Sequence, residues 1–256
     1  MIKSDLNINW NLSIKDFLEL LEKELYNGSF FIDVETTGLL GSTYEQLTQI
    51  SSIYTTYKNG KFEKVDTFNQ KIKLTQETRQ RFLNEETSKQ LKWVLSFNHY
   101  GDGDMKYIEE VKSLDNFYRW ILETNKSGNF IIQNSSFDMD MLNGRYYKEF
   151  TNNIIDTKMI IQLYYIPLLQ KLSETDNKYK DILDKIGTSE RDNGLISSSL
   201  SKIGPSMGLD MTNYHDGLKD CELTISMLEN MIDFLKMNIN KDIKKYQDER
   251  ISTYII

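Results

Sequence analysis

The stretch FFIDVETTGL, residues 30–39, decides how this chain folds. Its apolar start and the break at Thr-Thr-Gly predict a buried strand over residues 30–34 that ends in a turn. Side chains alternate along a strand, so Asp33 and Glu35 point to the same face. Two carboxylates on one side of a core strand repel each other and lose hydration, which favours a cation between them. The strand therefore either holds a hard divalent ion such as Mg²⁺ or Mn²⁺ or ends in two solvated acids.

A second stretch, FIIQNSSFDMDML over residues 130–142, repeats this pattern of strand, polar break and helix. We expect the helix to start with Ser135 or Ser136 as its N-cap. Asp138 then falls in the first turn, where the helix macrodipole favours an acid. An acid in that position is either a partner of the dipole or a metal ligand. Asp140 is two residues further on, and the helix turns it well away from Asp138.

The third stretch, NYHDGLKDCELT over residues 213–224, contains one of only two histidines in the chain. An offset of five residues on a helix turns His215 and Asp220 about 140° apart, so both cannot face one site from within the same helix. We therefore expect His215 in the loop before a helix that is capped by Asp216 or Gly217. A loop histidine is often only a surface residue. Its spacing from the acid at 220 favours a general base, since its pKa lies near neutrality.

The ordered triplet DVETTGL, NSSFDMDML and HDGLKDCELT resembles the signature of the DEDDh 3′-5′ exonucleases. That family includes the proofreading subunits of bacterial polymerases and ribonuclease T, and the resemblance covers residues 29–232. It implies an α/β, ribonuclease-H-like fold and the hydrolysis of phosphodiesters at 3′ ends. It also implies two divalent metal ions, Mg²⁺ or Mn²⁺, held by Asp33, Glu35, Asp138 and Asp220, with His215 as the general base.

The resemblance further implies residues that hold the terminal nucleotide. Those expected after the first motif are Thr36, Thr37, Gly38 and Leu39. Leu39 would be the wedge beside the last base, and Asn134 and Phe137 would add contacts near the second motif. Asp156 falls where many members carry an Asp-Thr pair, and we expect it to be structural or to support the site from behind.

Two departures from the family pattern concern the surroundings of the site. Many members have a His-Asn pair before the second motif, whereas this chain has Gln133 and Asn134. The His-Gly-Ile-Thr segment of polymerase-associated members is absent between Thr75 and Ile108. A polymerase-bound proofreader is therefore disfavoured.

The chain is predicted to form one exonuclease domain over residues 1–256, because the site residues come from distant parts of the sequence. We expect a mixed five-stranded sheet flanked by helices. The predicted strands are 30–34, 49–57, 62–74, 129–133 and 153–156, with a Lys-Asn-Gly turn between the second and third. The predicted helices are 106–123, 137–147 and 157–165. Residues 76–105 and 168–194 do not fit this plan and are interpreted as insertions.

The first insertion mixes cations with an aromatic residue: Arg79, Arg81, Lys89, Lys92 and Trp93. Such a set can follow a single strand and stack a base. The alternative is a solvated helix with Trp93 packed on the core, and we favour this alternative.

Composition points to a soluble, cytoplasmic protein. Cys221 is the only cysteine, no N-terminal signal segment is evident, and no apolar run is long enough to cross a bilayer. No membrane role is predicted. Alanine is absent while Ile, Asn and Lys are plentiful, which is typical of an AT-rich genome. A bacteriophage or a low-GC bacterium is a reasonable source, and a phage protein would act in the host cytoplasm.

The net charge of −7 argues against broad capture of duplex nucleic acid, which depends on many Lys and Arg contacts to phosphates. We predict a 3′-5′ exonuclease that grips a few nucleotides at single-stranded DNA ends and releases nucleoside 5′-monophosphates. An RNA-trimming enzyme with the same site is the first alternative, since sugar discrimination depends on contacts that short motifs do not reveal. A non-catalytic nucleic-acid-binding or partner-binding module on this fold is the second. Protein partners are not indicated.

Overall fold

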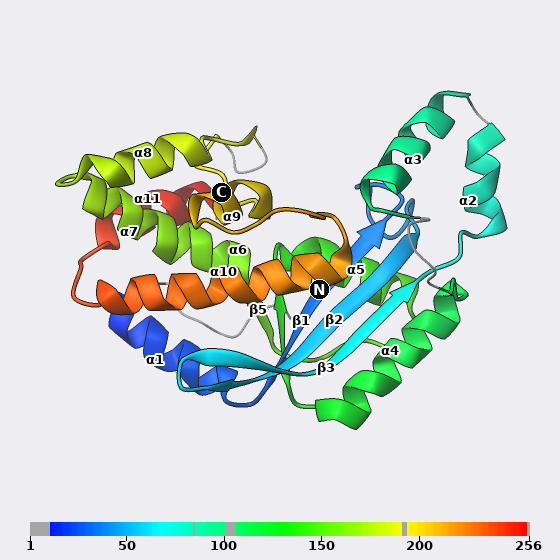
Figure 1. Ribbon diagram of the computed structural model, residues 1–256, viewed down its shortest axis with the longest axis horizontal. Helices are drawn as coiled ribbons and strands as arrows, with labels where there is room; N and C mark the ends of the chain where they lie inside the picture. The colour runs from blue at the N-terminus through cyan, green and yellow to red at the C-terminus, as the bar shows by residue number, and fades with distance from the viewer. Residues whose placement is uncertain (1–10, 84, 101–105, 191–193, 255–256) are drawn as a thin grey trace.

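A five-stranded mixed sheet forms the centre of the computed structural model, which describes residues 11–83, 85–100, 106–190 and 194–254 (Figure 1). The strands are β1 (Ser29–Thr36), β2 (Leu47–Lys58), β3 (Lys61–Lys71), β4 (Asn129–Ile132) and β5 (Ile154–Asp156). Their order in the sheet is β3-β2-β1-β4-β5. β2 is antiparallel to both β1 and β3, whereas β4 is parallel to β1 and to β5. The predicted α/β class and the mixed five-stranded sheet flanked by helices are confirmed.

The hairpin between β2 and β3 turns at Asn59 and Gly60, both in the left-handed backbone region with φ of 52° and 82°. Asn and Gly adopt this region most readily, and two such residues in succession match the twist of a hairpin. The predicted Lys-Asn-Gly turn is confirmed, although β3 ends at Lys71 rather than at residue 74.

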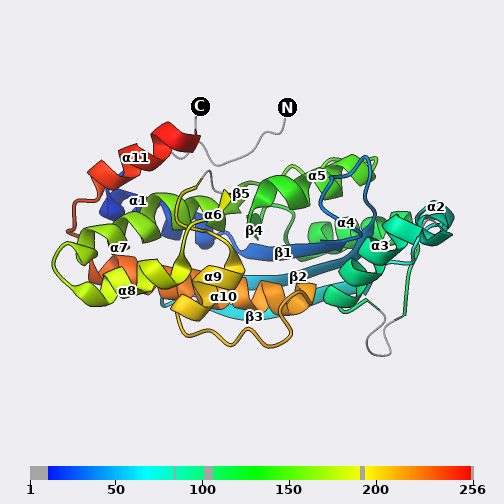
Figure 2. The ribbon, with the colours of Figure 1, turned by 90° about the horizontal axis from the view of Figure 1, so that it is seen from above.

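The alternation of side chains divides the sheet into two apolar faces. Phe31 and Ile53 belong to a cluster with α1 (Ile14–Leu25) and α10 (Gly217–Met237). Phe30 and Ile32 belong to a second cluster, with α4 (Glu110–Asn125) and α5 (Ser135–Arg145). Figure 2 shows α10 along one side of the sheet and α5 on the other. Since Asp33 and Glu35 continue the alternation of Phe31, they belong to the α10 face.

α10 is the element that covers the acidic end of β1. The thiol of Cys221, in its second turn, donates to the carbonyl oxygen of Phe31 at 3.3 Å, and Met227 and Leu235 are fully buried further along the helix. Across the described ranges no helix, the 21-residue α10 included, has the combination of length and apolar character that crossing a bilayer requires.

The helix after β5 continues further than predicted. α6 (Thr157–Ile160) passes through a π-helical segment, η2 (Ile161–Tyr165), into α7 (Ile166–Ser173). Pro167 is the second residue of α7 and follows the π-helical segment, so the helix continues past a residue that has no N–H to donate. Leu168 and Leu169, the first residues of the second predicted insertion, lie in α7 and are buried in the core. The remaining helices are α8 (Asn177–Ile186), α9 (Leu200–Ser206) and α11 (Lys244–Tyr254).

The first predicted insertion forms α2 (Gln76–Gln80), the short 3₁₀ segment η1 (Arg81–Leu83) and α3 (Glu85–Phe97). We call residues 76–83 and 85–100 the arm; in Figure 1 it rises beyond the tip of β1, at the end of the molecule opposite α7 and α8. Residues 101–105 of the predicted insertion lie outside the described residues.

The inward side of α3 is apolar: Leu91 and Leu95 are buried against Leu74. Trp93 lies about 200° around the helix from Leu91, and its side chain is 63% exposed. The interpretation that Trp93 packs on the core was therefore wrong.

Candidate active site

The two acids of β1 are held against the start of α10. Glu35 is 7% exposed. Oδ2 of Asp33 is buried and has no hydrogen-bond partner in the part of the chain that the structure describes. A Cβ atom at Gly217 would lie 3.2 Å from this oxygen and 2.8 Å from Oγ of Ser51, so glycine permits the close approach of α10. A buried carboxylate oxygen without a donor is costly, and a cation would remove the cost.

The loop before α10 places His215 and Asp220 together. The backbone of His215 has a φ of 71°, and its N–H donates to Oδ1 of Asp220 at 3.3 Å. The side chain of Asp216 accepts from the N–H groups of Leu218 and Lys219 and caps the helix. The predicted position of His215 in the loop and the predicted capping by Asp216 are confirmed.

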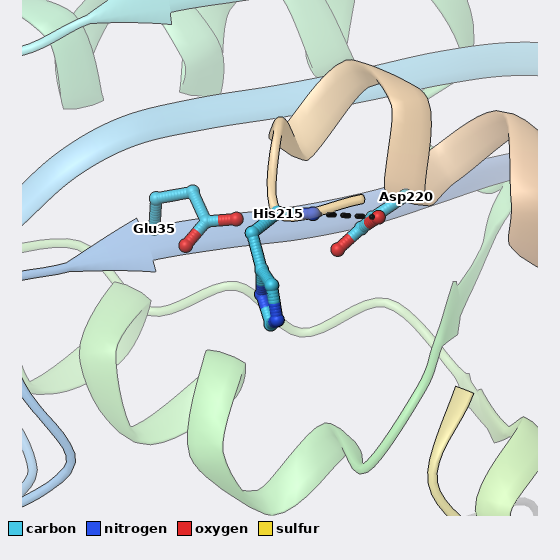
Figure 3. A group of neighbouring side chains, drawn as sticks. All are labelled: Glu35, His215 and Asp220. Carbon is cyan, nitrogen blue, oxygen red and sulfur yellow. Dashed lines mark hydrogen bonds between the residues drawn. The ribbon is translucent and has the colours of Figure 1, made fainter. Parts of the chain in front are cut away.

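Three of the predicted site residues converge on one point. A ligand atom from each of Glu35, His215 and Asp220 lies within 4.8 Å of the other two. Figure 3 shows Glu35 on β1 and Asp220 in the first turn of α10, with His215 between them. Two carboxylates and an imidazole at this separation are suitable for a divalent cation or for acid–base chemistry.

Asp138 reaches the same region from the other side of β1. It lies in the first turn of α5, is 5% exposed, and accepts from the backbone N–H of Val34 at 3.1 Å. The parallel pairing of β1 and β4 brings the start of α5 to the end of β1. Asp33 and Asp138 are not part of the group formed by Glu35, His215 and Asp220, as far as the described residues show. The charges of Asp33, Asp138 and Asp220 nevertheless act on one another.

The acids share a strong electrostatic penalty. Burial raises the pKa of Asp33 and of Glu35 well above the usual range, and repulsion from the neighbouring carboxylates raises both further. Burial also raises the pKa of Asp138 and raises that of Asp220 to about 7. Burial, followed by the charge of His99, lowers the pKa of His215 to about 4. His215 is therefore neutral at pH 7, but the expectation of a pKa near neutrality was wrong, and the lowered pKa makes its imidazole a weaker base. The acids favour a bound cation.

The raised pKa values predict that the protein becomes less stable as pH rises. Between the ordinary pKa of Asp220, 3.8, and its folded value of about 7, the folded chain binds a proton that the unfolded chain has lost. The free energy of unfolding therefore falls as pH rises through this window. Without metal, we expect a lower Tm at pH 8 than at pH 5, and a larger increase in Tm on adding Mn²⁺ at pH 8.

The isosteric variant Asp33→Asn isolates this effect from other titrating groups. Without metal it should melt at a higher temperature than the wild type at pH 8, and the difference should shrink at pH 5. Scanning calorimetry at the two pH values measures both quantities. An equal difference at the two pH values would contradict the electrostatic explanation.

Two residues beside the site were not predicted from the sequence. Lys71 is 2% exposed on β3, and the strand register aligns it with Gln49, which in turn pairs with Glu35. Its charge opposes the burial that raises the pKa of Glu35, and its Nζ donates to the carbonyl oxygen of His99 at 2.5 Å. Histidine is scarce in this chain, which was a signal that could have pointed to His99. Lys71 could be found only from the register of β1, β2 and β3, which the sequence does not reveal.

The threonines predicted to hold the terminal nucleotide are hydrogen-bonded within the protein. Oγ1 of Thr36 donates to the carbonyl oxygen of Gly38, and Oγ1 of Thr37 donates to Oε2 of Glu45, both at 2.5 Å. Gly38 packs so closely on Glu45 that a Cβ at this position would clash with its Oε1. Leu39, 67% exposed, is the one predicted residue of this loop whose side chain extends into solvent.

Asp156 organises the start of α5. It accepts from the backbone N–H groups of Asn134 and Ser135, at 3.1 and 3.0 Å, and from Oγ of Ser135 at 2.9 Å. The predicted N-cap at Ser135 or Ser136 was wrong: Asn134 takes this position in a left-handed conformation, and Asp156 supplies the acceptor. Phe137 is partly buried against the second apolar cluster. The expectation that Asp156 is a supporting residue agrees with these contacts.

Removing the carboxylate of Asp156 should destabilise the fold. In Asp156→Ala four donors lose their acceptor: the backbone N–H groups of Asn134, Ser135 and Lys158 and the hydroxyl of Ser135. Two of these hydrogen bonds are buried, so the free energy of unfolding should fall by about 1–3 kcal/mol. Urea unfolding followed by circular dichroism measures the loss. Asp181→Asn, a change at an exposed aspartate of α8, is the control and should stay within about 0.5 kcal/mol of the wild type.

Comparisons with known proteins found solved structures that are similar to this chain. The cell-death related nuclease 4 (CRN-4) is similar with a TM-score of 0.45 and 14% identity, over 82% of this chain and 64% of that one. This chain therefore spans less than two-thirds of that nuclease. Two further structures each have a TM-score of 0.44 and 14% identity, over 82% of this chain and 83% of theirs. One is a full-length 3′-exonuclease. The other describes the 3′-end-specific recognition of a histone mRNA stem-loop by a 3′-exonuclease. No protein-family model matches this chain, and no curated protein is similar to it in sequence.

Proposed function

We propose that this chain is a 3′-5′ exonuclease of the ribonuclease-H-like, DEDDh type, which removes nucleoside 5′-monophosphates from the 3′ ends of single-stranded nucleic acid, with DNA favoured. The observation that carries the proposal is the convergence of Glu35, His215 and Asp220 within 4.8 Å. All five residues of the ordered motifs are present in the chain, which disfavours a non-catalytic binding module.

The donor set fits a pair of divalent cations. Asp33, Glu35, Asp138 and Asp220 offer only carboxylate oxygens, the ligands that Mg²⁺ and Mn²⁺ prefer. The buried Oδ2 of Asp33 has no hydrogen-bond partner within the described residues. Burial, and then repulsion among the acids, raises the pKa values of Asp33 and Glu35. We infer that these four residues hold the ions, which would stabilise negative charge on the phosphodiester.

The chain's own residues divide the remaining tasks. His215, neutral at pH 7 and next to Asp220, accepts the proton of the attacking water. The hydrogen bond from its backbone N–H to Asp220 fixes the loop relative to α10. The loop after β1, in which Leu39 is exposed, positions the last nucleotide. The products are a nucleoside 5′-monophosphate and a strand with a new 3′-hydroxyl.

The test uses 5′-labelled single-stranded DNA and RNA of matched sequence, incubated with purified protein and Mg²⁺ or Mn²⁺. We expect a ladder that shortens from the 3′ end and that disappears when EDTA removes the metal. The substrate that shortens faster identifies the sugar preference. If neither substrate shortens with either metal, the proposal fails and a binding module becomes the better hypothesis.

A further inference from the structure

The loop after β1 is anchored from two sides. Oδ2 and Oδ1 of Asp140, on α5, accept from N–H and Oγ of Ser42 at 2.8 and 3.2 Å, and Nη1 of Arg145 donates to the Ser42 carbonyl oxygen at 3.2 Å. On the other side, the buried Glu45 accepts from Nη1 of Arg81 at 3.0 Å. The backbone of this loop is therefore fixed between α5 and the arm.

Large apolar side chains nevertheless remain in solvent on this loop and on the arm. They are Leu39, Leu40, Tyr44, Leu83 and Trp93, each between 63% and 85% exposed. These side chains lie on two segments that are joined by the Arg81–Glu45 hydrogen bond, and exposed apolar side chains beside a site are a feature of binding surfaces.

The arm is joined to the loop after β1 and to the end of β1. Arg81, in η1 between α2 and α3, forms an ion pair with Glu45 of that loop. At the C-terminal end of the arm, Nδ2 of Asn98 donates to the carbonyl oxygen of Thr36 at 3.0 Å, directly after Glu35. The carbonyl oxygen of His99 accepts from the buried Lys71. A molecule bound to the arm would therefore lie next to the candidate metal ligands.

The solvent side of α3 has the chemistry to bind a nucleic-acid strand. Lys89, Lys92 and Trp93 are spaced by three and four residues, so they share one face, and all three are exposed. An ammonium group neutralises a phosphate, and an indole ring stacks on any base. In a chain of net charge −7, cations on this face next to the acidic site favour a polyanion that approaches from this side.

We propose that the arm is a second substrate-binding surface, which takes the single strand on the 5′ side of the nucleotide being removed. This inference rests on the proposed exonuclease function. Trp93 and Tyr44 stack on bases, while Lys89 and Lys92 contact phosphates. The surface recognises backbone and base faces and therefore does not depend on sequence.

The experiment separates binding from catalysis. Fluorescence anisotropy of a 5′-fluorescein-labelled 20-mer of thymidylate, without metal, measures Kd for the strand. Hydrolysis of thymidine 5′-p-nitrophenyl phosphate with Mn²⁺ measures the chemistry on a substrate too short to reach the arm. Trp93→Ala should raise Kd for the 20-mer about 5- to 100-fold, the range for loss of one stacked base, and leave hydrolysis of the short ester unchanged. Trp93→Phe, which keeps an aromatic ring, should bind the 20-mer with most of the wild-type affinity.

The matched control is Tyr26→Ala, which removes an exposed aromatic ring at the C-terminal end of α1, a helix that lies away from the arm in Figure 1. It should leave Kd unchanged. The double variant Lys89→Gln, Lys92→Gln should lower the slope of log Kd against log salt by about 0.7 for each phosphate that a lysine no longer neutralises.

The outcomes distinguish the two proposals. If Trp93→Ala and the double variant bind the 20-mer as the wild type does, the arm is not a strand surface, whatever the activity. If the wild type binds the 20-mer through Trp93 but hydrolyses neither the short ester nor the 20-mer, the exonuclease proposal fails while the binding surface stands.

Discussion

We expect the Asp33→Asn variant to lose phosphodiester cleavage by about 10³-fold or more and to keep its fold. Asp33 is the acid whose buried Oδ2 has no partner within the described residues, so its charge is needed for a cation rather than for folding. Bound metal ions supply several kcal/mol of charge stabilisation in such reactions, and each 1.36 kcal/mol is a factor of ten in rate. Single-turnover cleavage of the labelled 20-mer in Mn²⁺ measures the loss.

Circular dichroism and Tm establish that this variant is folded, and Asp181→Asn serves as the matched change at an exposed aspartate. A variant at residue 33 that cleaves at the wild-type rate would remove Asp33 from the metal site and with it the proposed mechanism. If Asp33→Asn is both inactive and unfolded, the same cleavage measurement would be made on Asp33→Glu, which keeps the charge but displaces the carboxylate oxygens.

The second large effect is expected at His215. His215→Asn should lower the single-turnover rate by about 10²- to 10⁴-fold, the usual contribution of a general base. Asparagine is chosen because it tolerates the left-handed backbone of this position, whose φ is 71°. His215→Ala should show a loss of similar size.

The metal dependence separates two roles for His215, since it lies close enough to Glu35 and Asp220 to be a ligand. For a general base, the rate falls while the Mn²⁺ concentration that gives half-maximal activity stays the same. For a metal ligand, that concentration rises in His215→Asn. Wild-type rates at all Mn²⁺ concentrations would exclude His215 from the mechanism.

Local patterns were enough to predict the elements that carry the site. The alternation in β1, the Lys-Asn-Gly turn and the cap at Asp216 depend on residues within a few positions of each other. Neighbouring backbone and side-chain geometry determines such features whatever the rest of the fold does. The prediction ended the helix after β5 at residue 165, whereas the helix continues through a π-helical segment and past Pro167.

Long-range contacts were the part that the sequence did not reveal. Asp156 caps a helix whose own serines were expected to do so, and Lys71 reaches the site across two strands. Trp93 was expected on the core, and the burial of Leu91 and Leu95 turns it outward. Each depends on which residues meet after folding. For Lys71, a one-residue change of strand register would move the side chain to the other face of the sheet.

The sequence by itself determined that Asp33 and Glu35 share a face and that His215 precedes the helix of Asp220, because backbone periodicity alone sets these relations. Only the tertiary structure decided that α10 covers this face, that Asp138 reaches Val34 from 104 residues away, and that the arm is fastened beside Thr36. These contacts arise because burial of the two apolar faces fixes where distant segments lie, and apolar burial has no direction that a sequence motif could encode.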